Sequence, residues 1–241
     1  MQNRYTGDIG DFGKLGLLRT LQAQGFTIGV NWYLTPDEDH NEDGKYTKYL
    51  DDEMYRKCDE SLWLELKQIV EADQRKVSAL QNDRILQAVF YDEILDFAGK
   101  KKTERISTRE EWHKQALDQL SDLDVVFVDP DNGLVVPSAE GRPKENKYAK
   151  PDELLAYYRK GSTVIYYQHK ARRQDDFYIE QHKKLIKSPG LEGSTGLGLK
   201  FKTTSQRYYF FILQPRHREL IEKTVNEMVS SAWGEHFCDL R

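Results

Sequence analysis

The sequence predicts an α/β fold: a Rossmann-like, mostly parallel sheet with helices on both faces and a C-terminal antiparallel hairpin strand. Two β-branched apolar runs, at residues 124–129 and 163–168, are too short for helices and are typical of strands buried on both faces. Helical patterns lie between the strands, as in a parallel sheet with crossover helices. Two further strands around residues 204–206 close the order as a hairpin.

Each element follows from a local pattern. Phe12, Leu15, Leu18 and Leu21 form one apolar stripe that ends at Gly25, which indicates a helix. In the first half of the chain we expect a helix at 11–24, a strand at 26–34, a polar loop at 37–45, helices at 46–58 and 60–73, and a strand near 88–95. In the second half we expect a helix at 110–120, a strand at 124–129, a loop at 131–149, a helix at 151–160, a strand at 163–167, a helix at 175–187, strands at 197–203 and 207–213, and a helix at 216–229.

Composition limits the class of protein. The balance of 38% hydrophobic and 32% charged residues is that of a globular protein. The length of 241 residues predicts a single α/β domain over 1–241, with a possible helical insertion at about 46–83. The net charge of -4 gives no general indication of nucleic-acid binding, although local basic patches are compatible with it. Cys58 and Cys238 fit neither a metal site nor a disulfide framework, and no run approaches the roughly 20 apolar residues of a membrane span. We expect a cytoplasmic protein without a membrane partner; the oligomeric state stays open.

The ends of the two central strands carry the strongest candidate site. Asp129, Asp131 and Asn132 follow one strand, and His169 follows the next. We expect these four residues to be catalytic. Because ligands of open α/β sheets bind at the carboxyl ends of the strands, we also expect Asp129, Asp131 and His169 to line one cleft together with Asp11 of the opening element. The alternative is a strand-to-loop turn in which Asp and Asn cap the backbone and Gly133 supplies a positive φ.

The opening element contributes a second group. Gly10, Asp11 and Lys14 stand at the expected start of the first helix, where glycines admit a ligand and free N–H groups attract anions. Their spacing is neither a dinucleotide fingerprint nor a P-loop. The alternative is that Asp11 simply caps the helix.

Basic and acidic residues near the strand ends suggest further ligands. Arg172 and Arg207 are candidates for binding substrate phosphate, or else solvated surface residues. Residues 39–44 match the first half of a calcium loop, but Leu50 stands where a bidentate glutamate is required. A looser divalent-cation site would use Asp37, Asp39 or Asp43.

The element order, the Asp-Pro tip and the closing hairpin resemble the class I S-adenosylmethionine-dependent methyltransferases. The tip Asp129-Pro130-Asp131-Asn132 resembles the Asp/Asn-Pro-Pro-aromatic tip of enzymes that methylate exocyclic amino groups of bases, with its first two positions matched. Gly10-Asp11-Phe12 is similar to the Gly-Asn-Phe-centred opening element of bacterial ribosomal RNA adenine-N6 methyltransferases. The glycine-rich loop of that fold has no counterpart, because residues 35–44 contain a single glycine.

The resemblance implies S-adenosylmethionine as cofactor, bound near Gly10, Asp11, Lys14 and Asp37. It also implies that Asp129 holds an amino group of a nucleic acid or nucleotide. One alternative is a Mg- or Mn-dependent nuclease or phosphodiesterase, with Asp129 and Asp131 as metal ligands. Another is a non-catalytic binding module on the same fold.

Overall fold

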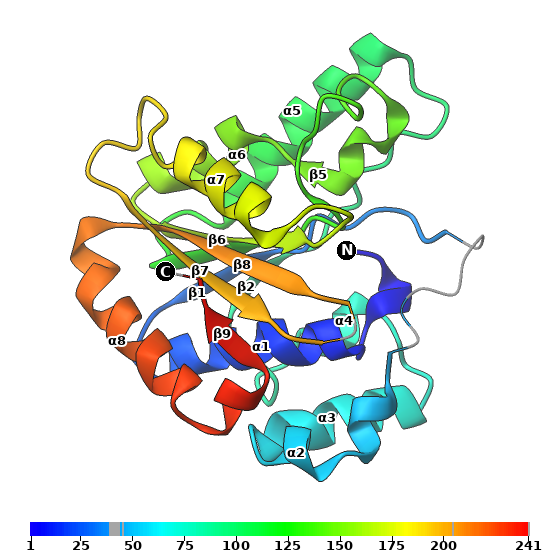
Figure 1. The fold of residues 1–241 in the computed structure, drawn as a ribbon. Helices are drawn as coiled ribbons and strands as arrows, with labels where there is room; N and C mark the ends of the chain where they lie inside the picture. Colours follow the sequence, from blue (N-terminus) through cyan, green and yellow to red (C-terminus); the bar gives the residue numbers. More distant parts are fainter. Residues whose placement is uncertain (39–43, 45, 204, 241) are drawn as a thin grey trace.

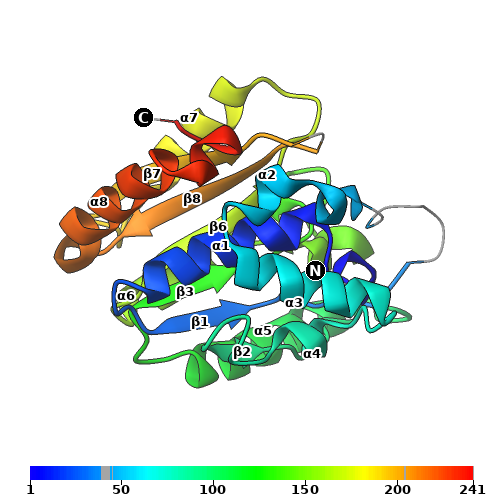
Figure 2. The ribbon, with the colours of Figure 1, turned by 90° about the horizontal axis from the view of Figure 1, so that it is seen from below.

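The computed structural model describes residues 1–38, 44, 46–203 and 205–240. The strands of its main sheet are β1 (Ile28–Asn31), β2 (Val89–Tyr91), β3 (Val125–Val128), β6 (Thr163–His169), β7 (Thr195–Phe201), β8 (Arg207–Leu213) and β9 (Phe237–Asp239). The longer helices are α1 (Ile9–Gln22), α3 (Glu60–Glu71), α5 (Lys102–Gln119), α6 (Pro151–Arg159), α7 (Asp175–Leu185) and α8 (Arg218–Val229). Figures 1 and 2 show the sheet between two layers of helices, which confirms the predicted fold class.

The seven strands lie in the order β2-β1-β3-β6-β8-β7-β9. Strands β2, β1, β3 and β6 are parallel, and Val126 of β3 pairs with Val164 of β6. The predicted pairing of the two central strands is therefore confirmed. Strand β8 runs antiparallel to both β6 and β7, so the predicted hairpin is present as well. Strand β1 lies between β2, the next strand of the main sheet along the chain, and β3. The strand order therefore reverses between β1 and β3, and in open α/β sheets a ligand crevice forms at the carboxyl ends of the strands at such a point.

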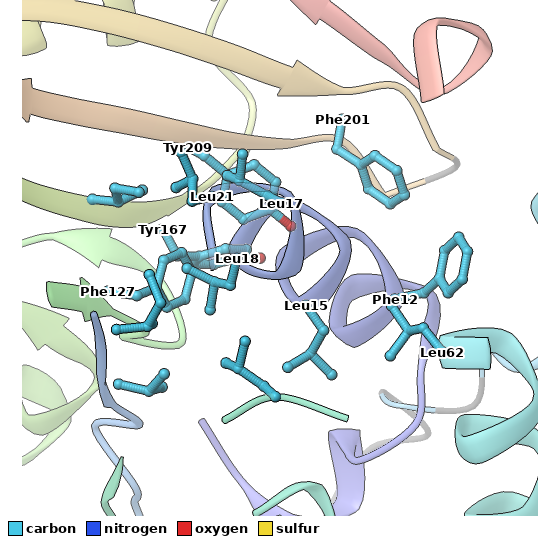
Figure 3. Packing of buried hydrophobic residues seen from close by; sticks show 14 of the residues in the cluster. Phe12, Leu15, Leu17, Leu18, Leu21, Leu62, Phe127, Tyr167, Phe201 and Tyr209 are labelled. Atoms are coloured by element: carbon cyan, nitrogen blue, oxygen red, sulfur yellow. The ribbon is translucent and has the colours of Figure 1, made fainter. Parts of the chain in front are cut away.

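The hydrophobic core has two parts, one on each face of the sheet. Helices α1, α3 and α8 cover one face, and α5, α6 and α7 cover the other (Figure 1). Figure 3 shows α1 at the centre of the first part, with Phe12 toward Leu62 and Leu18 toward the sheet residue Phe127. The predicted apolar stripe of α1 is buried along its whole length.

The start of α1 differs from the expectation in a way that matters for the site. The helix begins at Ile9, and Asp8 caps it by accepting hydrogen bonds from the backbone N–H groups of Gly10 and Asp11. The interpretation of Asp11 as the cap was wrong, and Gly10 lies inside the first turn.

A Cβ atom at Gly16 would lie 2.2 Å from the ring of Trp233, so this glycine allows the C-terminal segment to pack directly on the helix.

Of the two helices expected in residues 46–83, the one at 60–73 is present as α3, and the one at 46–58 is not. The expected helix at 46–58 is replaced by a short 3-10 helix, η2 (Lys48–Asp51), and a short α-helix, α2 (Glu53–Arg56), because Asp52 between them is extended and caps α2. Helix α4 (Val77–Leu80) follows α3. Buried side chains from these pieces belong to the same core as α1. No helix in the described residues is long and apolar enough to cross a membrane.

The loop after β3 is structured, although no periodic element was expected in it. Strands β4 (Gly133–Leu134) and β5 (Tyr148–Ala149) pair in parallel, with η3 (Pro143–Lys147) between them. Arg109 of α5 anchors the loop by donating to the carbonyl oxygens of Glu145 and Tyr148, and it forms a buried ion pair with Glu153 at 2.6 Å. This anchoring fixes the segment that follows Asp129. Gly133 has the positive φ (96°) expected of it.

Candidate functional site

A cavity of about 690 Å³ opens at the carboxyl edge of the sheet, among the first turn of α1, the tips of β3 and β6, and the start of β8. It brings together seven predicted site residues: Gly10, Lys14, Asp129, Asp131, Asn132, His169 and Arg207. The cavity also includes residues that were not singled out, among them Met1, Tyr5, Asp8, Glu38, Tyr46, Lys147, Tyr167, Lys170, Ser205 and Gln206. The expected cleft at the two strand ends is therefore present.

Lys14 ties the opening helix to the tip of β3. Its ammonium lies 2.5 Å from Oδ2 of Asp129 and 3.0 Å from Oδ1 of Asp11. All three side chains are buried. Burial alone would lower the pKa of Lys14, but the two carboxylates outweigh it and raise that pKa, so the lysine stays protonated. Lys14 thus holds Asp129 in place instead of reaching freely into the cavity.

Asp11 lies behind Lys14 and does not line the cavity, contrary to expectation. Its Oδ2 accepts a hydrogen bond of 2.8 Å from the backbone N–H of Gly7. Burial raises the pKa of Asp11 to about 6, against the attraction of Lys14 and with a further contribution from Asp8. The sequence placed Asp11 at the helix end, but the helical turn directs its side chain inward, toward the lysine three positions later.

Asp131 is bound by the first two residues of the chain. The ammonium of Met1 lies 2.6 Å from its Oδ1, and Gln2 Nε2 donates to its Oδ2 at 2.8 Å. Burial alone would raise the pKa of Asp131, but the ammonium and Gln2 hold it below its ordinary value. Met1 also donates to the carbonyl oxygens of Tyr33 (3.0 Å) and Asp129 (3.1 Å), so it fills the gap between the tips of β1 and β3.

The opposite wall carries His169 and Arg207. Nδ1 of His169 lies 3.4 Å from the hydroxyl of Tyr167. Arg207 donates to the carbonyl oxygen of Ser205 at 2.9 Å and lies 3.5 Å from Oδ2 of Asp8. Burial alone would lower the pKa of Arg207, but Asp8 raises it. A Cβ atom at Gly10 would lie 2.8 Å from Arg207 Nε, so the glycine lets this wall close on the helix.

Besides Asp11, two predicted residues, Asp37 and Arg172, lie outside the cavity. Asp37 is exposed and accepts hydrogen bonds of 3.3 Å from the Asn3 side chain and the Arg4 backbone, while its neighbour Glu38 lines the cavity. The reason is that β1 ends early, at Asn31, and the following segment continues past Met1 before it reaches the rim. Arg172 is exposed beyond the end of β6. Asp39 and Asp43 lie outside the described residues.

The described residues contain no group of three His, Cys, Asp or Glu side chains that could hold a metal ion. The two carboxylates expected as alternative metal ligands each contact a cation of the chain itself: Lys14 for Asp129, and the Met1 ammonium for Asp131. This arrangement does not favour the phosphodiesterase interpretation.

Comparison with known proteins adds little. No family model matches the chain. No curated protein matches it. A crystal structure of protein LPL1258 from Legionella pneumophila str. Philadelphia 1, described by the family model DUF519, is similar over 98% of this chain and 96% of that chain, at 10% identity and a TM-score of 0.39.

Proposed function

We propose that the chain is a methyltransferase-like enzyme that uses S-adenosylmethionine to methylate an amino group of a nucleic acid or nucleotide. The observation that carries the proposal is the position of Asp129. It follows a central parallel strand, precedes a proline, and lines a polar cavity at the carboxyl edge of the sheet. The resemblance implies this place for the residue that binds the amine.

The acceptor side of the reaction is assigned to Asp129 and Pro130. Lys14 contacts Oδ2 of Asp129, and no described residue donates a hydrogen bond to Oδ1. Oδ1 can therefore accept a hydrogen bond from a substrate amine while Lys14 fixes the carboxylate. Pro130, whose carbonyl is the second acceptor that the resemblance implies, lines the same cavity. Together the two groups would orient the amine nitrogen.

The cofactor side is assigned to the cavity above Gly10. Pockets for ligands of this size commonly enclose about 300–1,000 Å³, so the volume is sufficient. Asp8 carries a carboxylate that pairs with Arg207, and Glu38 and Lys147 form an ion pair of 2.5 Å with each other at the cavity wall. The proposal requires bound S-adenosylmethionine to exchange the Glu38–Lys147 pair for contacts with its own positive groups and its carboxylate. This donor set fits the charges of S-adenosylmethionine, which when bound supplies the methyl group. Because Met1 fills the gap between β1 and β3, the cofactor must lie on the cavity side of Met1.

Tyr46 is the proposed stacking partner of the base. The tip of β3 has Asp131 and Asn132 where the resembled enzymes have a proline and an aromatic residue. Tyr46 lines the cavity with 47% of its surface exposed, so an aromatic ring is available from another wall. A planar base would be held there by stacking.

A methyl-transfer assay tests the proposal. The wild-type protein is incubated with S-adenosylmethionine carrying a labelled methyl group and with separate pools of RNA, DNA and nucleosides. Removal of a hydrogen bond made in the transition state costs about 2–4 kcal/mol, so Asp129→Ala should lower methyl transfer roughly 30- to 1000-fold while cofactor affinity changes little. Asp129→Asn, which retains an acceptor oxygen, is the matched control.

Two outcomes would overturn the proposal. Undiminished methyl transfer by a folded Asp129→Ala protein would remove Asp129 from the reaction. Mn-dependent cleavage of nucleic acid that is lost in Asp129→Asn would favour the phosphodiesterase. A cytoplasmic location is part of the proposal and agrees with the free thiols of Cys58 and Cys238.

A further inference from the structure

The segment between β6 and α7 extends the cavity wall onto the surface. Lys170 and Ala171 line the cavity, and the chain then continues through Arg172 and Arg173, both exposed, into the first turn of α7. We call residues 170–177 the basic rim. Any polymer whose reactive group enters the cavity beside His169 can reach this rim with its neighbouring units.

The positive charge of the basic rim is not neutralised by its own acids. Asp175 is shared by two lysines, since it contacts both Lys170 and Lys200, and it also accepts a 2.8 Å hydrogen bond from Tyr208. Within the described part of the chain, Arg172 and Arg173 form no ion pair with a carboxylate. Asp176 is the one exposed carboxylate of residues 170–177, so the arginines are in excess. This local charge contrasts with the net charge of -4 of the whole chain.

An exposed aromatic ring accompanies the two arginines. Phe177 leaves 41% of its surface accessible, and the guanidinium of Arg173 lies 5.3 Å from its ring centroid. An exposed phenylalanine beside cations offers a face on which an unpaired base can stack, while the guanidinium groups meet phosphates.

We infer that the basic rim binds a single-stranded nucleic acid, with Arg172 and Arg173 on the phosphates and Phe177 against an unpaired base that flanks the one in the cavity. The inference rests on the proposed function for what enters the cavity. It adds the strandedness of the substrate and the residues that hold its flank. Arginine pairs match phosphate geometry, and a duplex would keep its bases stacked and out of reach of Phe177. An acidic peptide would form ion pairs with Arg172 and Arg173 but would place no base against Phe177.

Fluorescence anisotropy tests this inference without any cofactor. The probes are 20-nucleotide single strands of RNA and of DNA with one sequence, and the corresponding duplexes, each measured at several salt concentrations. The RNA and DNA arms distinguish the two sources of the phosphate backbone. Arg172→Glu/Arg173→Glu should weaken single-strand binding and lower the magnitude of the slope of log K against log salt by about 1.4, since each phosphate contact on a single strand contributes about 0.7. Phe177→Ala should weaken single-strand binding about 5- to 150-fold and duplex binding far less.

A charge-matched variant on the distant helix α8, Arg218→Glu/Lys223→Glu, is the control, since both residues are exposed and outside the cavity. It should leave binding unchanged.

Equal losses of nucleic-acid affinity in the control and rim variants would refute the inference, as would duplex binding as tight as single-strand binding. Competition by poly-glutamate as effective as that by nucleic acid would assign the rim to an acidic protein partner instead. If the rim variants bind nucleic acid as tightly as wild type while S-adenosylmethionine still binds, the inference is wrong and the proposed function is unaffected. If the rim variants lose nucleic-acid binding but S-adenosylmethionine does not bind, the inference holds and the proposed function is wrong.

Discussion

Asp11 provides a quantitative test of the electrostatics beneath the site. In the folded chain its pKa is raised from 3.8 to about 6, because its burial outweighs the attraction of Lys14. The folded protein therefore binds this proton more tightly than the unfolded chain does, and the stabilisation is fully present only below pH 3.8. It is lost as the pH rises through about 6. At 1.36 kcal/mol per pKa unit, the loss between pH 4 and pH 7 is about 2–3 kcal/mol.

Asp11→Asn removes the titration and retains an oxygen that can accept from the Gly7 N–H. The free energy of unfolding of wild type and variant is measured by urea titration at pH 4, 5, 6 and 7. Relative to wild type, the variant should gain about 2–3 kcal/mol in stability between pH 4 and pH 7. Asp131→Asn is the control. The pKa of Asp131 is lowered, so its stabilisation is present above pH 3.8 and is lost only at lower pH, and the stability difference between this variant and wild type should stay nearly constant from pH 4 to pH 7. A stability difference for Asp11→Asn that is equally independent of pH would show that Asp11 does not have the raised pKa.

Three further changes have expected outcomes. Lys14→Met leaves Asp11 and Asp129 buried without their cation and should cost about 3–5 kcal/mol in urea unfolding, partly restored by adding Asp129→Asn; an unchanged midpoint would contradict the buried triad. Gly16→Ala places a methyl group against Trp233 and should lower stability by about 1–3 kcal/mol, and a rise in melting temperature would show that α1 is not packed there. Tyr46→Ala should weaken binding of a nucleotide substrate about 5- to 150-fold in equilibrium titration while stability holds, and unaltered affinity would remove the stacking role.

Sequence patterns predicted the central elements of the fold because burial on both faces leaves a strong signal. The run ending at Asp129 and the run ending at His169 both became buried parallel strands, and their adjacency followed from the crossover rule. The region at 46–58 was predicted poorly because Asp52 interrupts an otherwise helical pattern with its own cap. Strand β9 was not predicted; it is three residues long and pairs only at the edge, with β7.

The candidate site was predictable where it depends on strand ends and not where it depends on distant contacts. Asp129, Asp131 and His169 share the cavity because neighbouring parallel strands end together. The pairing of Lys14 with Asp129 joins residues 115 positions apart, and no local pattern indicates it. Placement of Met1 against Asp131 likewise depends on tertiary structure alone. Asp37 was misplaced because the strand before it ends earlier than its β-rich sequence suggests.

The proposed function requires that the cavity above Gly10 binds S-adenosylmethionine beside Asp129. A crystal structure of the protein with S-adenosylhomocysteine, paired with isothermal titration of the same ligand, is the decisive measurement. We expect measurable heat and electron density between Gly10 and Glu38, with the sulfur facing Asp129 and with Lys14 still bound to that carboxylate. Absence of heat at high micromolar ligand, or density for a metal ion bridging Asp129 and Asp131 in crystals grown with manganese, would contradict it.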